Sequence, residues 1–248
     1  MSTPTRRIID VTQRPWARHR ELQRFLGPYV RERQAGIFFS QDTPSPQRRL
    51  VAAAFLKLPA ALQAICREYD VTFSCCQGST VFGNSSSFYG DFEQSCRQYI
   101  SPHIEVGKRS RSRSLLLPHL THEAAHLWWR HLPAEARRQY ARFLVQSCQP
   151  GKVEVTRYVQ GLFQIWCEAL ALPDTATFRE ENRLRHQRLW VEESFCDTVA
   201  ILHVAGYPSR NRQSTVDIGQ RRKQVRELAG LALAEPACPD RQPVLVCR

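Results

Sequence analysis

The sequence predicts an α+β protein in which a small mixed sheet precedes a mainly helical C-terminal half. Apolar and polar residues alternate, as is typical of strands, at 71–75 and again at 103–106. Beyond residue 114, apolar residues recur at helical spacing in one segment after another. The chain has 248 residues, of which 42% are hydrophobic, so it is long enough and apolar enough to bury a sizeable core.

The region before the sheet divides at about residue 50. Residues 1–50 are rich in Arg, Gln and Pro, and we expect a basic, partly disordered N-terminal arm with a short helix at 15–26 and an exposed loop at 41–49. Apolar residues at helical spacing predict a helix over 50–69. A single domain is expected over 51–235, and a short tail over 236–248.

The sheet itself is expected to be small. Between its two strands, the Gly- and Ser-rich stretch 78–90 reads as a loop, with short strand candidates at Val81-Phe82 and Phe88-Tyr89. After residue 114, Pro and Gly residues separate the helical segments, and Pro118 suits the first turn of the earliest one. The later helices are predicted at 133–147, 155–172, 185–205 and 216–234.

Composition narrows the class of protein. No apolar run approaches the length of a membrane span. The nine Cys are odd in number and include no C-x-x-C pair, which favours reduced thiols over a disulfide framework. The first residues lack an apolar stretch of signal-peptide length, so we expect a cytoplasmic protein, with export by a non-Sec route left open.

The charge balance indicates an acidic partner without naming it. The formal net charge of +12 suits nucleic acid, an anionic membrane surface or an acidic protein. No zinc-finger spacing or RNA-recognition signature accompanies the charge, so nucleic acid is not indicated by any motif. The basic stretch 107–114 is either a solvated loop or a positive rim that favours acidic substrate segments.

The most informative motif is H-E-x-x-H, formed by His122, Glu123 and His126. On a helix, residues four apart share a face, so the two imidazoles can bind one metal ion, and imidazole suits zinc. Glu123 is offset by one residue, and from there its carboxylate can take a proton from an activated water. The alternative is an amphipathic helix whose histidines are ordinary surface or core residues.

A catalytic zinc needs three protein ligands, and the segment around residue 193 offers the third. Glu193 and Asp197 stand four apart, so both carboxylates lie on one helical face. One of them can bind the metal while the other accepts the free ring N–H of a ligand histidine. Glu192 is expected to point elsewhere. The alternative is a solvated acidic face, but the apolar neighbours Trp190 and Phe195 indicate a buried helix.

The H-E-x-x-H helix followed by E-x-x-x-D on a later helix resembles the gluzincin class of zinc metalloproteases. Within that class the chain is most similar to the anthrax lethal factor-like and CAAX prenyl protease-like branches, over about residues 70–205. The resemblance implies a zincin-like domain at 51–235, with His122, His126 and Glu193 as zinc ligands. It further implies Glu123 as general base and Asp197 as the carboxylate that orients a ligand histidine.

Two departures from related patterns bear on the mechanism. The extended motif with a third His fails, because Trp129 stands where Gly is needed and Leu132 where the His is needed. Proteases of the lethal factor-like type use a Tyr one or two turns before the ligand Glu to stabilise the oxyanion. His186 holds that place here, and the sequence leaves His186, His203 and Tyr207 as candidate donors.

The function expected from the sequence is that of a zinc-dependent endopeptidase. Water activated by zinc and Glu123 would attack a peptide carbonyl of a protein or peptide substrate, for which acidic segments are favoured. A second reading has the same fold without turnover: a basic interaction module that binds an acidic protein or nucleic acid. Zinc-dependent proteolysis separates the two, as does salt-sensitive binding to nucleic acid.

Overall fold

A computed structural model describes residues 29–69, 71–75, 88–90, 103–106, 113–147, 153–171, 177–204 and 216–234. The predicted arm helix at 15–26, most of the basic loop and the tail at 236–248 lie outside these ranges. In chain order the elements are β1 (Tyr29–Glu32), β2 (Ile37–Ser40), α2 (Ser45–Phe55), α3 (Ala60–Glu68), β3 (Thr72–Cys75), β4 (Phe88–Gly90), β5 (His103–Val106), α4 (Arg113–His131), α5 (Ala134–Gln146), α6 (Arg157–Ala171), α7 (Thr177–His203) and α8 (Ile218–Ala234). The predicted α+β class is confirmed, and every described element after β5 is a helix.

The sheet is mixed, as predicted, and has five strands in the order β1-β2-β3-β5-β4. The pairs β2–β3 and β3–β5 are parallel, whereas β1 and β4 pair antiparallel at the two edges. The central strand β3 is buried along its whole length, and its Phe73 contacts Phe39 of β2 and Phe55 of α2. The strands predicted at 71–75, 103–106 and Phe88-Tyr89 are thus present.

The sheet begins earlier than the sequence indicates. Residues 29–40 lie in the segment expected to be an arm, but they form a hairpin whose Ile37 and Phe39 are buried. Gly36 closes the turn with a φ of 68°, a left-handed conformation that residues with a Cβ rarely adopt, and its N–H bonds to the carbonyl of Glu32. The Ile-Phe-Phe-Ser sequence of β2 lacks the alternation seen at 71–75 and 103–106, so this hairpin is hard to recognise from the sequence.

Helix boundaries also depart from the predictions. The loop expected at 41–49 contains the start of α2, and the helix expected over 50–69 is two helices that break at Pro59. Proline disfavours helical geometry in the residue before it, which explains the break. Helix α4 begins at Arg113, so Pro118 lies inside the helix rather than in its first turn. A proline inside a helix removes one backbone hydrogen bond and crowds the carbonyl four residues earlier, which costs about 3 kcal/mol.

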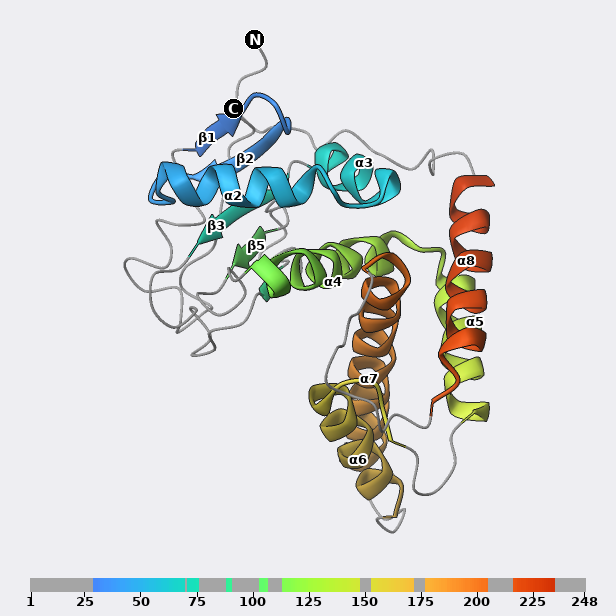
Figure 1. Ribbon diagram of the computed structural model, residues 1–248. Coiled ribbons are helices and arrows are strands. Elements are labelled where there is room, and N and C mark those ends of the chain that lie inside the picture. The colour runs from blue at the N-terminus through green and yellow to red at the C-terminus, as the bar shows by residue number, and fades with distance from the viewer. Residues whose placement is uncertain are drawn as a thin grey trace, which may run out of the picture.

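Helix α7 is the centre of the helical half. It packs against α4, α5, α6 and α8, and Figure 1 shows it running down from α4 with α6 alongside. Most residues from 190 to 201 are buried all round the helix, which is the pattern of a helix enclosed by other elements. Trp190 stacks on Trp166 of α6 at a centroid distance of 4.8 Å, and Phe195 contacts Trp129 of α4 and Tyr140 of α5.

A buried ion pair holds α8 and the segment before α6 against α7. Arg221 of α8 and Glu154 are almost fully buried and lie 2.8 Å apart, and Trp190 of α7 donates its indole N–H to the Glu154 carboxylate. Arg221 also donates to the hydroxyl of Ser194. Such a pair is tolerated in a core because each charge has several hydrogen-bond partners. The arrangement fixes residue 154 close to the face of α7 that carries the predicted site. None of the described helices is both long and apolar enough to cross a membrane.

Candidate metal centre

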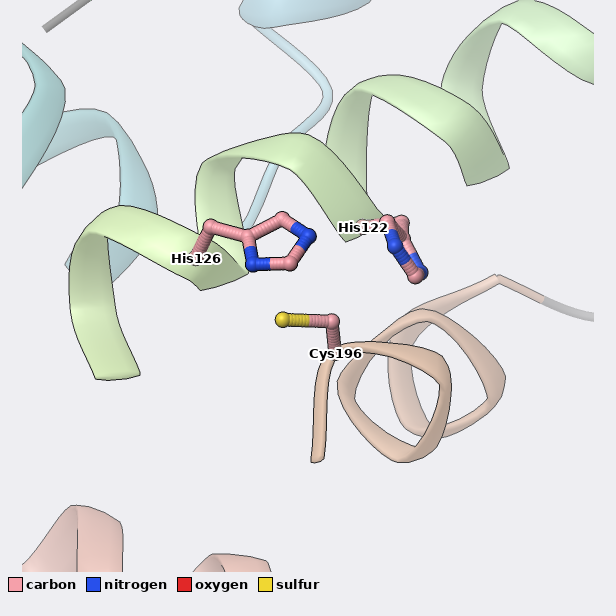
Figure 2. Close-up of side chains that lie close together, drawn as sticks. All are labelled: His122, His126 and Cys196. Carbon is pink, nitrogen blue, oxygen red and sulfur yellow. The ribbon is translucent and has the colours of Figure 1, made fainter. Parts of the chain in front are cut away.

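The two histidines of the H-E-x-x-H motif lie on one face of α4, turned towards α7. Their ring centroids are 5.1 Å apart, and their side chains are 14% and 10% exposed for His122 and His126. Figure 2 shows both imidazoles beside α7, with the side chain of Cys196 projecting from α7 beneath them. The spacing of four residues therefore has the predicted effect of placing both rings together.

Each imidazole uses its Nδ1 atom to contact a carboxylate of α7. Nδ1 of His122 lies 3.0 Å from Asp197, and Nδ1 of His126 lies 2.8 Å from Glu192. When Nδ1 donates to a carboxylate, the tautomer is fixed and the Nε2 lone pair is free to bind a metal. Carboxylate–histidine pairs of this kind are common behind zinc-ligating imidazoles. Nε2 of His122 also lies 3.1 Å from Glu193, so in the absence of a metal a protonated imidazole can donate from both nitrogens.

The two Nε2 atoms face the carboxylate of Glu193. One oxygen lies 3.1 Å from Nε2 of His122, and the other lies 3.6 Å from Nε2 of His126. Ligand atoms about 2.0–2.2 Å from a tetrahedral zinc ion are separated by roughly 3.4 Å. The two contacts involve different oxygens of Glu193, so the carboxylate must turn before a single oxygen and both nitrogens can share one zinc ion.

The electrostatics of the centre favour a cation. Burial would lower the pKa of both histidines, but the carboxylates outweigh it: Asp197 and Glu193 hold the pKa of His122 well above its ordinary value, and Glu193 and Glu192 raise the pKa of His126. In return, the imidazoles lower the pKa of Glu193 against the effect of its burial. A field that favours protonated imidazole also favours a divalent metal ion, with which protons would compete.

Cys196 is a second candidate for the third ligand, and no sequence motif marks it. Its sulfur and one nitrogen from each histidine lie within 4.8 Å of one another, so His122, His126 and Cys196 could hold a metal ion. Burial, followed by the charges of the surrounding carboxylates, raises the pKa of the Cys196 thiol well above its ordinary value. Zinc binding would remove the proton from this thiol, whereas the histidines already lower the pKa of Glu193, so both side chains are candidates for the third ligand.

Glu192 corrects an expectation from the sequence. Spacing alone places it away from the centre, but the structure shows it bonded to His126. On α7, Glu192 and Cys196 share one face and Glu193 and Asp197 share the next, about 100° around the helix. Helix α4 lies over the ridge between the two faces, and a Glu side chain is long enough to reach it from either one.

Glu123 is buried, with 8% of its surface exposed, and its charge acts on both Cys196 and Tyr158. Its carboxylate therefore lies within electrostatic range of Cys196 and Tyr158. Its role as general base stays a prediction.

The three residues predicted from the sequence as hydrogen-bond donors to the oxyanion have no described contact that supports this role. His186 lies on α7 seven residues before Glu193, or about 10 Å along the helix axis. His203 is exposed at the end of α7, where partial burial and then the charge of Arg226 lower its pKa. Tyr207 lies outside the described residues. Thus none of them has a described contact with the centre, and the role of His186 stays a prediction.

Tyr158 was not singled out by the sequence, because no motif marks it. It is the second residue of α6 and is 62% exposed. Partial burial, and then the charges of Glu193 and Glu123, raise its pKa, so its phenol is protonated at neutral pH and lies within the field of the centre. An exposed phenol within electrostatic range of Glu193 and Glu123 can donate a hydrogen bond to a bound molecule.

No known family model matches this chain, and no curated protein or solved structure is significantly similar to it. The centre is therefore interpreted from its own geometry.

Zinc titration of three variants tests the choice of third ligand. Glu193→Gln should weaken zinc binding by more than the roughly 10- to 100-fold that is typical of losing a residue behind a ligand. Cys196→Ser should leave the zinc dissociation constant within about threefold of the wild type, because the proposed set of two imidazoles and one carboxylate does not include the thiol. Glu192→Gln, which keeps a carbonyl oxygen for Nδ1 of His126, serves as the matched control and should have an intermediate effect. A large loss in Cys196→Ser with none in Glu193→Gln would reassign the ligand.

Proposed function

We propose that this protein is a zinc-dependent endopeptidase with a zincin-like catalytic centre. The observation that carries the proposal is the pairing of both histidines. Each places Nδ1 within hydrogen-bond distance of a carboxylate and turns Nε2 towards Glu193, on opposite sides of the same carboxylate group. A helix with incidental histidines has no need of this matched arrangement.

The ligand set favours zinc of the catalytic type. Two imidazole nitrogens and one carboxylate oxygen form a three-ligand set that leaves a fourth position for water or substrate. A zinc ion bound there would polarise a carbonyl and lower the pKa of water. His122, His126 and Glu193 would hold the ion, while Asp197 and Glu192 keep the histidines in the ligating tautomer.

Glu123 would be the general base. It follows His122 directly on α4, and its buried carboxylate lies in the same acidic cluster as Glu193. It would take a proton from the attacking water and then deliver it to the amine that leaves when the peptide bond breaks. Because the neighbouring imidazoles are engaged by other carboxylates, Glu123 is the residue of the motif left to this role.

Tyr158 would stabilise the oxyanion in place of the residues suggested by the sequence. A phenol with a raised pKa stays protonated and can donate a hydrogen bond to the developing negative charge on the substrate carbonyl. Its 62% exposure places it where a substrate can reach it. The substrate would be a protein or peptide, and the net charge of +12 favours acidic segments near the scissile bond.

Glu123→Gln tests the proposed reaction. The amide keeps the size of the side chain but cannot accept the proton, so zinc should remain bound while cleavage falls about a hundredfold or more. Cleavage can be measured on a proteome-derived peptide library, with new termini identified by mass spectrometry. The matched control is Glu135→Gln, on the exposed face of α5, which should cleave like the wild type.

Equal cleavage by Glu123→Gln and the wild type would show that Glu123 is not the base. If the zinc-loaded wild type cleaves no peptide but binds nucleic acid with strong salt dependence, the protein is the basic interaction module instead.

Comparing Tyr158→Phe with His186→Gln tests which of the two residues donates a hydrogen bond to the oxyanion. Removing the hydroxyl should lower kcat about a hundredfold, as losing one oxyanion donor does, with little change in zinc affinity. His186→Gln should change kcat by much less. The reverse order, with His186→Gln severely impaired and Tyr158→Phe active, would restore the assignment made from the sequence.

A further inference from the structure

Thr156 connects the start of α6 with the metal centre. Its hydroxyl donates to Oδ2 of Asp197 at 2.7 Å, while Oδ1 of the same carboxylate contacts Nδ1 of His122 at 3.0 Å. The Thr156 oxygen also accepts the backbone N–H of Val159, and its carbonyl accepts the first helical bond, from Gln160. Thr156 is thus the N-cap of α6 and, at the same time, a hydrogen-bond donor to the carboxylate behind the histidine.

The position of Thr156 is fixed from both sides. Two residues earlier, Glu154 is held by the buried Arg221 and by the indole of Trp190. Its backbone N–H also bonds to the side chain of Gln160 in α6. The adjacent residue, Val155, is buried in a small cluster with Ile201 and Val216. The hydroxyl therefore has little freedom to move away from Asp197.

We propose that Thr156 is a positioning residue that orients Asp197 and, through it, His122 for metal binding. The inference rests on the proposed metal centre. In it Asp197 contacts the ligand His122, and Thr156 contacts Asp197. Asp197 is 2% exposed, so water offers little replacement for a lost donor. Without the Thr156 hydroxyl, the Asp197 carboxylate can rotate, and its hydrogen bond to the His122 imidazole weakens. His122 then spends less time in the tautomer and ring orientation that bind a metal.

Zinc affinity of Thr156→Val and Thr156→Ser is the primary test, measured by competition with a chromophoric chelator. Valine keeps the shape but not the hydroxyl, and it should weaken zinc binding about tenfold, near the lower end of the range for residues behind a ligand. Serine keeps both the helix cap and the donor, so it should restore the affinity to within about threefold of the wild type.

Two further variants separate positioning from general destabilisation. Thr198→Val removes another buried hydroxyl of the same region, one that bonds to the Ser194 carbonyl and Tyr140 rather than to a carboxylate. It should lower stability without changing zinc affinity by more than about twofold. In an Asp197→Asn background, Thr156→Val should have little added effect on zinc affinity, because the two residues act in series.

The outcomes distinguish the two levels of the proposal. If zinc affinity depends on Asp197 but is unchanged in Thr156→Val, or if Thr156→Val adds its full effect to Asp197→Asn, the positioning role is wrong and the metal centre stands. If Thr198→Val weakens zinc binding as much as Thr156→Val, the effect is one of general stability and the positioning role is again wrong. If the wild type binds no zinc, the metal centre itself is wrong.

Discussion

The pairing of two imidazoles on α4 with three carboxylates on α7 is the interaction on which the rest of the structure depends. These groups are largely buried, and burying charges is costly unless each one has a partner. Through Nδ1, His122 contacts Asp197 and His126 contacts Glu192. Through Nε2, both histidines contact Glu193. The two helices must therefore be held at one distance and rotation, because a shift of either helix would lengthen several of these contacts together.

The surrounding packing supplies that rigidity. Aromatic side chains of α4, α5 and α6 enclose α7, with Phe195 against Trp129 and Trp190 stacked on Trp166. The Arg221–Glu154 pair, which also accepts the indole N–H of Trp190, fixes α8 and the segment leading into α6. Bulky aromatic contacts and a buried ion pair have few alternative arrangements, so they determine the rotation of α7 more narrowly than aliphatic packing alone would. The carboxylates are then presented to α4 by a helix that has little freedom to turn.

Much of this centre could be predicted from the sequence, because helical spacing converts directly into shared faces. His122 and His126, and likewise Glu193 and Asp197, are four apart and lie where the period of the helix places them. The contribution of Glu192 could not be predicted in the same way, since it depends on where α4 crosses α7. Tyr158 and Thr156 come from the start of α6, and only the tertiary fold brings that helix end to the centre. Cys196 shares this dependence, because one sulfur on a buried helix carries no signal of its own.

In the fold, too, some elements can be predicted from local sequence and others depend on tertiary contacts. The strands at 71–75 and 103–106 and the C-terminal helices follow from local periodicity, whereas the β1–β2 hairpin is stabilised by pairing with β3, which is remote in the sequence. The sheet therefore extends into the region where composition indicates only a basic arm. The division of the chain at residue 50 and its cytoplasmic location stay predictions.

The most direct test of the central claim is zinc K-edge X-ray absorption of the purified, zinc-loaded protein. The proposed ligands give a first shell of nitrogen and oxygen only, at about 2.0–2.2 Å, with the multiple scattering of two imidazoles. Such a spectrum, at one zinc ion per chain and unchanged in Cys196→Ser, would agree with a centre built from His122, His126 and Glu193. A sulfur scatterer at about 2.3 Å that disappears in Cys196→Ser, or a protein that retains no zinc, would contradict it.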